Sequence, residues 1–220
     1  MRIIITAATQ AEFQPAIDAF KAFPNAEVEC HVTGIGMLAT AVSLTKIIMH
    51  QKPDLVIQVG IAGTFNNDIQ LGKVVVVKEE IFGDTGVEED GVWKDIFDLN
   101  LMEPDSFPFT QKAIINPYLA KLNSLQLNEV VGITVNEIST NKQRIKQLQE
   151  KYNATIESME GAALHYVCTD LKVPFLQIRS ISNYIGERDK TKWQIIEAIN
   201  NLNKILVEMV TGYQTLNSKL

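Results

Sequence analysis

The sequence predicts an α/β fold, a three-layer α/β/α sandwich around a central mixed, largely parallel sheet. Two observations support this prediction. Apolar runs rich in β-branched residues alternate with helical patterns along the chain. These runs are mostly continuous rather than alternating, which is typical of strands buried on both faces. With 220 residues, 46% of them hydrophobic and 21% charged, the chain is long enough for one substantial core, so we expect residues 1–220 to form a single domain.

The first half of the chain has the clearest pattern. Four β-rich runs follow one another, and helical periodicity occurs after the first and the second. We expect strands at Arg2–Thr6, Val28–Thr33, Leu55–Val59 and Val74–Glu79, and helices at Phe13–Phe20 and Met37–His50.

The second half is less regular. Phe82 to Gln111 contains several glycines, prolines and acids, which favours a long excursion over the surface. Further along, an apolar stretch is typical of a buried strand, and the polar run Arg179–Asn183 follows it. Helical periodicity predicts helices at Lys142–Lys151, Met159–Leu171 and Trp193–Tyr213.

Charge and cysteine content narrow the classes of function. The formal net charge of −6, without a cluster of Lys and Arg, argues against nucleic-acid binding. Cys30 and Cys168 lie in apolar segments without metal-ligand spacing, which predicts two buried reduced thiols and a cytoplasmic protein. The N-terminal apolar run is too short for a signal peptide, and no run is long enough for a membrane helix. We therefore expect a small-molecule partner.

Two glycine-containing turns are expected at the carboxyl edge of the sheet, where open α/β folds bind ligands. Gly34–Gly36 resembles the glycine pattern of dinucleotide sites. It follows the second strand rather than the first, and Asp54 begins the next strand rather than ending it, so we reject dinucleotide binding. Purely structural turns are one interpretation. We favour ligand contact by the second turn, formed by Gly60, Ile61, Ala62 and Gly63.

Two carboxylates are candidates for chemistry. Glu160 lies at the start of an otherwise apolar helix, where a carboxylate is costly unless it is hydrogen-bonded. Vicinal sugar hydroxyls would satisfy it, and a helix acid favoured by the dipole is the alternative. Glu12 follows the first strand and is either a catalytic base or a first-turn helix acid. We assign no chemistry to the three histidines, which have no catalytic or metal-binding spacing: His31, His50 and His165.

Taken together, Glu12, Gly60–Gly63, Met159–Ala163 and Arg179–Asn183 resemble in order and spacing the purine nucleoside phosphorylase and nucleosidase superfamily. The resemblance implies a nucleoside substrate, no cofactor, no metal, and a homo-oligomer (dimer or larger).

Within that superfamily, Ser182–Asp189 followed by Trp193 is most similar to the futalosine hydrolase branch. That likeness implies hydrolysis of the N-glycosidic bond of futalosine, which yields hypoxanthine and dehypoxanthine futalosine in menaquinone biosynthesis. A methylthioadenosine/S-adenosylhomocysteine nucleosidase is the alternative enzyme. A non-catalytic nucleoside-binding protein of the same fold is the alternative from another class.

The resemblance also implies residue roles. Glu12 matches the hydrolytic base, Met159 a hydrophobic ribose contact, and Glu160 the acceptor for the ribose hydroxyls. Asn183 matches the purine-contacting position, where nucleosidases that act on 6-aminopurines usually have Asp. Its amide can donate to a 6-oxo group while its oxygen faces a protonated N7, which favours hypoxanthine as the leaving group. Ser182 beside it is also assigned to substrate binding.

Arg188 is assigned to the benzoate-bearing tail of futalosine, because a guanidinium can donate two parallel hydrogen bonds to a carboxylate. The alternative is a solvated Arg that pairs with a neighbouring acid, Glu187 or Asp189. Asp189 is also expected to cap a helix that begins near Thr191.

Three positions depart from the patterns of the superfamily. Ser158 stands where adenosine-type nucleosidases carry a second Glu. Ile138–Asn141 contains no aromatic residue, so we assign no purine-stacking residue. Gln58 stands where related phosphorylases hold phosphate with an Arg, which predicts water rather than phosphate as the nucleophile.

Overall fold

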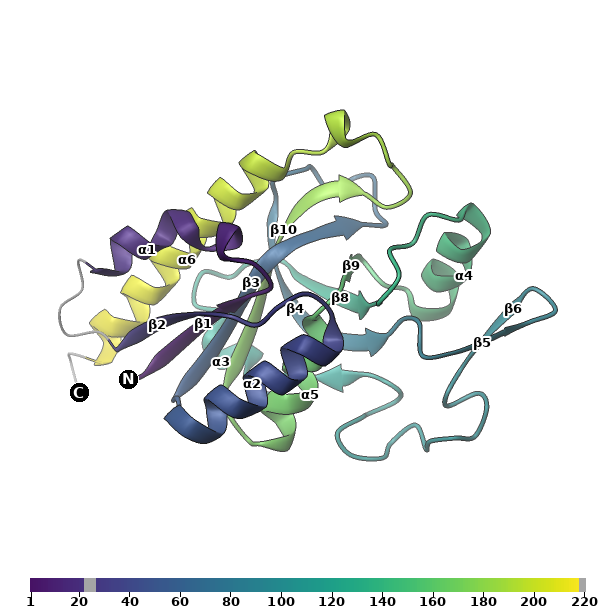
Figure 1. Ribbon diagram of the computed structural model, residues 1–220, viewed down its shortest axis with the longest axis horizontal. Coiled ribbons are helices and arrows are strands. Elements are labelled where there is room, and N and C mark those ends of the chain that lie inside the picture. Colours follow the sequence, from purple (N-terminus) through teal and green to yellow (C-terminus); the bar gives the residue numbers. More distant parts are fainter. Residues whose placement is uncertain (22–26, 218–220) are drawn as a thin grey trace.

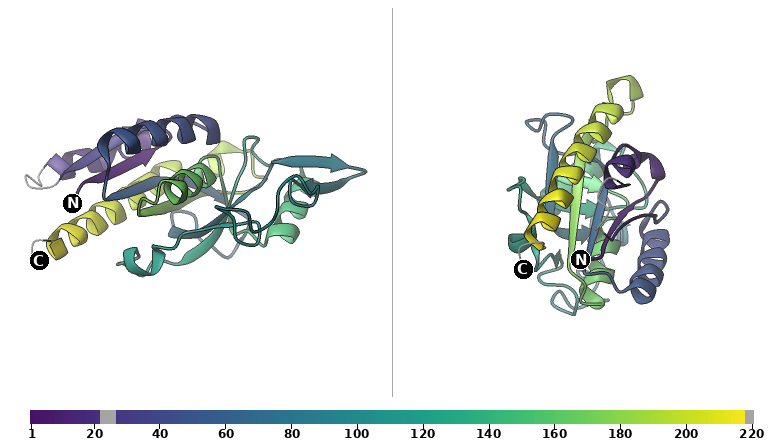
Figure 2. Two further views of the ribbon diagram at one scale, coloured as in Figure 1. Left: turned by 90° about the horizontal axis from the view of Figure 1, so that it is seen from below. Right: turned by 90° about the vertical axis from the view of Figure 1, so that its left-hand side faces the viewer.

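A computed structural model describes residues 1–21 and 27–217 of the chain. Its eight-stranded mixed sheet is covered by helices on both faces, which confirms the predicted fold class (Figure 1). On one face lie α1 (Gln14–Lys21) and α6 (Ile195–Asn217), and on the other lie α2 (Met37–Gln51) and α5 (Gly161–Asp170) (Figure 2).

Five strands of the sheet close into a ring, from which two more extend. The order is β10-β4-β8-β9-β3-β1-β2, and β10 also pairs with β3, while β7 pairs with β4. Parallel pairs outnumber antiparallel ones, which are β10–β4, β3–β9 and β4–β7. The strands are β1 (Ile3–Ala7), β2 (Val28–Val32), β3 (Leu55–Thr64), β4 (Val74–Phe82), β7 (Ile114–Ile115), β8 (Glu129–Thr134), β9 (Ile156–Ser158) and β10 (Phe175–Tyr184).

Strand β1 shows why its apolar run is continuous. Ile3 and Ile5 pack into the cluster under α1 and α6, whereas Ile4 packs into the cluster under α2. Successive side chains of a strand point to opposite faces, so a strand covered on both sides needs apolar residues at every position. All three isoleucines are fully buried.

The polar and glycine-rich ends of two strands differ from the expectation. Gly60–Gly63 and Arg179–Asn183 do not follow strands as turns but lie inside β3 and β10. The two segments pair with each other, with Arg179 opposite Gly60 and Asn183 opposite Gly63. The backbone therefore stays extended beyond the apolar run, because each segment supplies the hydrogen-bonding partner of the other.

The middle of the chain is more ordered than predicted. A two-stranded hairpin of β5 (Gly86–Glu89) and β6 (Val92–Asp95) projects from the body of the molecule (Figure 2). After it, Phe97 and Phe109 are buried in a small cluster of their own. The helix predicted at Lys142–Lys151 is present as α4 (Lys142–Tyr152). The remaining short elements are η1 (Gln10–Glu12), α3 (Leu119–Leu122) and η2 (Lys190–Lys192).

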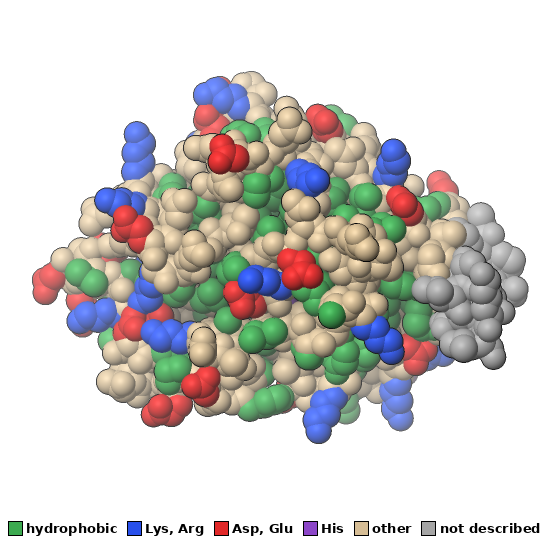
Figure 3. Space-filling model, turned by 180° about the vertical axis from the view of Figure 1, so that it is seen from behind, with side chains coloured by type: hydrophobic (Ala, Val, Ile, Leu, Met, Phe, Trp, Pro, Cys, Tyr) green, Lys and Arg blue, Asp and Glu red, His purple; other side chains and the backbone are tan. Residues whose placement is uncertain are grey.

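On the face shown in Figure 3, Lys and Arg side chains are interspersed with Asp and Glu. Cys168 is buried as expected, but Cys30 is only half-buried, so the expectation of two buried thiols is wrong for Cys30. Both cysteines are free. None of the helices in the described ranges is long and apolar enough to cross a membrane.

Candidate active site

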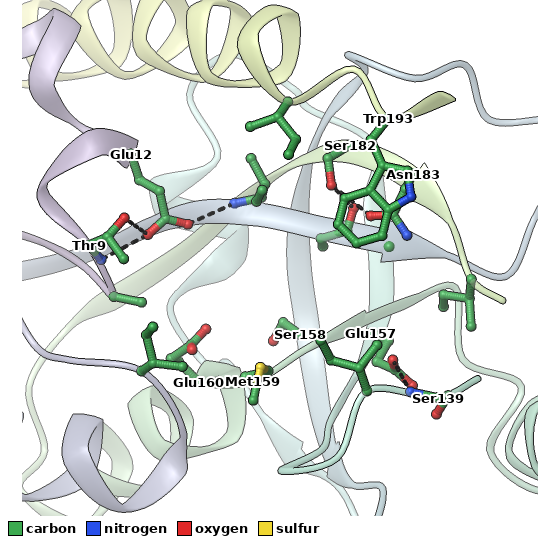
Figure 4. Close-up of a pocket in the computed structure, with 18 of the residues that line it drawn as sticks. Thr9, Glu12, Ser139, Glu157, Ser158, Met159, Glu160, Ser182, Asn183 and Trp193 are labelled. Carbon is green, nitrogen blue, oxygen red and sulfur yellow. Dashed lines mark hydrogen bonds between the residues drawn. The ribbon is translucent and has the colours of Figure 1, made fainter. Parts of the chain in front are cut away.

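A pocket of about 380 Å³ opens at the carboxyl ends of β1, β3 and β10 (Figure 4). Small-molecule sites commonly have volumes of about 300–1,000 Å³. All but one of the predicted site residues line it: Glu12, Ile61, Ala62, Gly63, Met159, Glu160, Ser182, Asn183 and Arg188.

Glu12 is held at one end of the pocket by donors to both of its oxygens. Oε2 accepts from the Thr9 backbone N–H at 3.0 Å and from the Thr9 hydroxyl at 3.2 Å, and Oε1 accepts from the Ile61 N–H at 3.2 Å (Figure 4). The side chain is buried. From α6, Asn203 donates to the backbone carbonyl of Glu12 at 2.8 Å. The carboxylate is therefore fixed in orientation, and Oε1 keeps a lone pair for a further donor.

Glu160 caps the start of α5 and faces the same pocket. Its Oε1 accepts from the Gly36 N–H at 3.1 Å, which joins the turn after β2 to the site. Ile35 of that turn also lines the pocket. The prediction that both glycine segments reach one edge of the sheet is thus confirmed. Met159, next to Glu160, supplies an apolar wall.

Arg179 is a buried cation beside Glu160, and no individual role was predicted for it. Only 1% of it is exposed. Its Nη2 donates to Gln58 Oε1 at 2.9 Å, and its Nη1 lies 3.6 Å from Glu160 Oε2. Gly60 makes room for it, because a Cβ at Gly60 would lie 2.3 Å from Arg179 Nη1 and 2.9 Å from Glu12 Oε1.

Gly60 therefore differs from the expectation of ligand contact. It does not line the pocket but lies against the guanidinium. Only a glycine fits there, because the Arg179 side chain comes so close. The sequence could not show this, since Arg179 lies 119 positions later in the chain and reaches Gly60 only through the pairing of β10 with β3.

Asn183 occupies the other end of the pocket. A bulge in β10 between Ile181 and Asn183 sets Asn183 rather than Ser182 opposite Gly63. The Ser182 hydroxyl donates to Asn183 Oδ1 at 2.8 Å, and Asn183 Nδ2 donates to the Tyr184 carbonyl at 3.2 Å. Both amide atoms keep capacity for a ligand. Ser182 thus orients Asn183 as well as lining the pocket.

Glu157 is a pocket residue that the sequence interpretation missed. It lies in β9 and is buried, with 6% exposed. Its Oε1 accepts from the Ser139 N–H at 3.0 Å (Figure 4). Burial raises the pKa of this carboxyl above its ordinary value. The sequence pattern around Glu157 could not indicate this position, because a three-residue strand has no detectable periodicity.

Arg188 and Trp193 close the outer side of the pocket. The Arg188 guanidinium lies 5.5 Å from the centre of the Trp193 ring. The neighbouring acids are engaged elsewhere: Glu187 pairs with Lys192 at 2.7 Å, and Asp189 caps the short helix η2 by accepting from the Thr191 N–H. The alternative in which Arg188 pairs with these acids is not what the structure shows.

Trp193 is the only aromatic residue among the described residues that line the pocket. Its ring is therefore the one aromatic surface that this lining offers to a ligand, whereas Ile138–Asn141, where an aromatic residue was sought, contains none.

A further buried carboxyl, that of Glu80, lies outside the pocket lining. It accepts from Gln177 at 2.8 Å and from the Thr134 hydroxyl at 2.9 Å. Burial raises the pKa of Glu80 to about 7. This carboxyl does not line the pocket. No group of three or more His, Cys, Asp or Glu side chains in the described ranges could hold a metal ion.

The family model of the phosphorylase superfamily matches residues 2–211. Futalosine hydrolase of Thermus thermophilus is 31% identical over 180 residues, which are 77% of this chain and 75% of the relative. A 5'-methylthioadenosine/S-adenosylhomocysteine nucleosidase of Bacillus velezensis is 28% identical over 172 residues, 75% of this chain and 71% of the relative.

Solved structures show the same fold. Futalosine hydrolase of Helicobacter pylori has a TM-score of 0.81 at 20% identity and covers 96% of this chain and 98% of that one. A 5'-methylthioadenosine/S-adenosylhomocysteine nucleosidase of Colwellia psychrerythraea in complex with adenine has a TM-score of 0.76 at 20% identity, with 96% and 95% covered.

Proposed function

The chain belongs to the phosphorylase superfamily and is a nucleosidase of that family, and from this premise we propose that it hydrolyses the N-glycosidic bond of futalosine. The products are hypoxanthine and dehypoxanthine futalosine, and the reaction serves menaquinone biosynthesis. The observation that carries the proposal is one pocket with carboxylates of Glu12 and Glu160 at one end and the amide of Asn183 at the other (Figure 4).

The proposed reaction is dissociative. The glycosidic bond breaks first, and the electron pair goes to the purine, which takes up a proton from solvent at N7 while Asn183 stabilises it through its amide. Glu160 accepts from the ribose hydroxyls and holds the sugar in position. Glu12 takes a proton from the water that adds to C1'. Arg179, paired with Glu160, keeps a positive charge beside two carboxylates that would otherwise repel each other.

Water is preferred to phosphate because the pocket lacks a free cation at the sugar end. Gln58 is neutral, and the guanidinium of Arg179 is already engaged by Gln58 and Glu160. Among the described residues that line the pocket, Arg188 is the only Lys or Arg, and it lies beside Trp193 at the outer side. A phosphate dianion next to Glu12 and Glu160 would be poorly compensated.

A panel of futalosine, inosine and methylthioadenosine tests the choice of substrate. Each nucleoside is incubated with the full chain, and the released base is separated by chromatography. Free hypoxanthine from futalosine is expected as the main product. Release of adenine from methylthioadenosine without turnover of futalosine would favour the other activity found among the relatives, which is a second candidate because of the 28% identity to such an enzyme.

Asn183→Asp is expected to shift the substrate preference away from 6-oxopurines. A carboxylate has only acceptors, so it has no donor for O6 of hypoxanthine, whereas it can accept a hydrogen bond from the exocyclic amine of a 6-aminopurine. The ratio of futalosine to methylthioadenosine turnover should fall by about 10- to 100-fold, the range for one lost hydrogen bond beside a charge. An unchanged ratio would show that Asn183 does not contact the purine edge.

Arg188→Gln should raise KM for futalosine by about 10- to 100-fold, because a charge-assisted hydrogen bond to the carboxylate of the tail is lost. Turnover of inosine, which has no such tail, should hardly change. Lys190→Gln is the matched control, since Lys190 is an exposed cation two residues away that does not line the pocket. Equal losses on futalosine and inosine would mean that Arg188 supports the loop instead.

A further inference from the structure

Glu80, Gln177 and Thr134 form a chain of buried polar side chains at the start of α5 that the proposed reaction does not use. Glu80 of β4 accepts from the Gln177 amide at 2.8 Å and from the Thr134 hydroxyl at 2.9 Å. All three side chains are fully buried, and Glu80 lies so close to α5 that a Cβ at Gly161 would collide with it. Among the described residues, no Lys or Arg forms an ion pair with Glu80. An ionised Glu80 would therefore be a buried charge without a direct counter-charge, which is costly.

Both ends of this chain reach the first turn of α5. The Ala162 N–H donates to the Thr134 hydroxyl at 2.8 Å. At the other end, Gln177 lies close enough to His165 for a hydrogen bond between the two side chains to affect the pKa of the ring. Ala162 and His165 are three positions apart, so they lie on one face of the helix. Glu160 directly precedes this turn, and its position therefore depends on the chain.

The hydroxyl of Thr134 shows where a proton on Glu80 would lie. Thr134 accepts from the Ala162 N–H, and it donates its single hydroxyl proton to Glu80 Oε2. A proton on Oε2 would leave the Thr134 proton without this acceptor. A proton carried by Glu80 therefore lies on Oε1, the oxygen that faces the Gln177 amide.

Two further atoms of the chain lack a partner. Gln177 Oε1 and His165 Nε2 are both buried without a well-formed hydrogen bond among the described residues. His165 Nδ1 lies 2.8 Å from the Ile114 carbonyl, so Nδ1 carries the ring proton. Burial lowers the pKa of His165 to about 4, which keeps the ring neutral at pH 7 and leaves Nε2 as an acceptor. Gln177 therefore presents an oxygen to a neighbour that needs a donor.

A half-turn of the Gln177 amide, together with a proton on Glu80 Oε1, pairs all of these atoms. Glu80 then donates to Gln177 Oε1, and Gln177 Nε2 donates to His165 Nε2. We propose that Glu80 keeps this proton in the folded protein and is a positioning residue for Glu160, because the neutral chain fixes the first turn of α5. The part of the inference that concerns Glu160 rests on the proposed function, in which this residue holds the ribose.

The charges around Glu80 explain why its neutral form matters. Besides His165, two charged groups act on it: Arg179 of β10, which favours the ionised form, and Glu160, which disfavours it. Arg179 and Glu160 already pair with each other at 3.6 Å. A neutral Glu80 leaves the guanidinium to Glu160, whereas an ionised Glu80 would compete for it. Burial raises the pKa of Glu80 to about 7, so this competition begins as the pH rises through 7.

Infrared difference spectroscopy of the full chain tests the proton directly. Spectra of wild-type protein and of Glu80→Gln are compared at pH 6, in water and in heavy water. The wild-type protein is expected to show a protonated carboxyl band that shifts in heavy water and is absent from the variant. Glu79→Gln is the matched control, because Glu79 is the preceding residue of β4, is half-buried and pairs with Lys78, so it should lose a carboxylate band instead. A carboxylate band for Glu80 would overturn the inference, whichever nucleoside the protein cleaves.

The pH dependence of stability gives a second test of the proton. The folded protein holds the Glu80 proton up to about pH 7, whereas the unfolded chain holds it only up to about 4.5, the ordinary pKa. The wild-type protein should therefore lose stability relative to Glu80→Gln as the pH rises from 4.5 to 7, with the ratio of their unfolding constants changing by up to about 10-fold per pH unit. His165 titrates in both proteins and does not enter the ratio. A constant ratio would contradict the inference.

Thr134→Val tests the positioning of Glu160, because it removes the hydroxyl that joins Glu80 to α5 while nearly keeping the shape of the side chain. A loss of about 10-fold in kcat/KM for nucleoside hydrolysis is expected, the effect of one hydrogen bond. Thr134→Ser, which keeps the hydroxyl, should recover most of this loss. Affinity for the free base, which has no ribose, should stay within about 3-fold of the wild-type value. An equal loss of base affinity, or no recovery by Ser, would mean that Thr134 supports only the fold.

The pH profile of activity separates positioning by Glu80 from a purely structural role. As the pH rises from 7 to 8, kcat/KM of the wild-type protein should fall relative to that of Glu80→Gln by up to about 10-fold, because an ionised Glu80 competes with Glu160 for Arg179. The substrate is whichever of futalosine and methylthioadenosine the panel shows to be cleaved, so failure of the futalosine proposal leaves this test intact. Parallel profiles would show that the charge of Glu80 does not act on Glu160 and would overturn the positioning role.

Discussion

Glu12→Gln is expected to lower kcat/KM for nucleoside hydrolysis by about 10²- to 10⁴-fold, the range for loss of a general base. A carboxamide cannot take the proton from the attacking water. Glu12 is buried at the end of the pocket that the proposed pose assigns to the sugar, with its two oxygens held by Thr9 and Ile61. The loss should therefore fall mainly on kcat, since the residue makes no contact with the base in the proposed pose.

The fold of this variant should persist. One carboxamide atom would face a donor that it cannot satisfy, at a cost of about 1–3 kcal/mol in the free energy of unfolding. Thermal unfolding and steady-state kinetics are measured side by side. Glu103→Gln is the control, because Glu103 is exposed and distant from the pocket lining. Turnover near that of the wild-type protein would remove Glu12 from the mechanism.

Glu160→Gln should lower kcat/KM on nucleosides by about 100-fold or more, because two acceptors for the ribose hydroxyls are weakened together. The variant also leaves Arg179 without its counter-charge, and this guanidinium is almost completely buried. A lower melting temperature is therefore expected as well.

Free hypoxanthine provides the internal control for Glu160, because the base has no ribose. Its affinity should stay within about 3-fold of the wild-type value, well below the effect of one lost hydrogen bond. A parallel loss of nucleoside turnover and of base affinity would mean that the substitution disturbs the whole pocket rather than the sugar contact.

The core elements could be predicted because a single rule governs them. A run such as Ile3–Ile5 is apolar at every position because both faces of β1 are covered, and α2 begins at the predicted residue and ends one residue beyond the predicted end. Short strands were not predicted, because no such rule governs them. β9 has three residues, two of them polar, and it is a strand only because β3 and β8 lie on either side of it.

Site residues could be predicted where their neighbours in the sequence single them out. They could not be predicted where the pairing of distant strands brings them together. Glu12, Glu160 and Asn183 were found because a polar residue beside an apolar segment is conspicuous, and a resemblance gave them roles. Arg179 and Gly60 face each other only through the pairing of β10 with β3. Glu157 and Asn183 come to line one pocket because both lie opposite Gly63. No pattern along the chain encodes these pairings.

The nucleophile is the most direct test of the central claim. Futalosine is incubated with the protein in water enriched in ¹⁸O, with and without inorganic phosphate, and the sugar product is analysed by mass spectrometry. If water attacks as proposed, the product carries one solvent oxygen at C1', and hypoxanthine appears at the same rate in both samples. A sugar 1-phosphate that forms only when phosphate is added, without the label, would contradict the account.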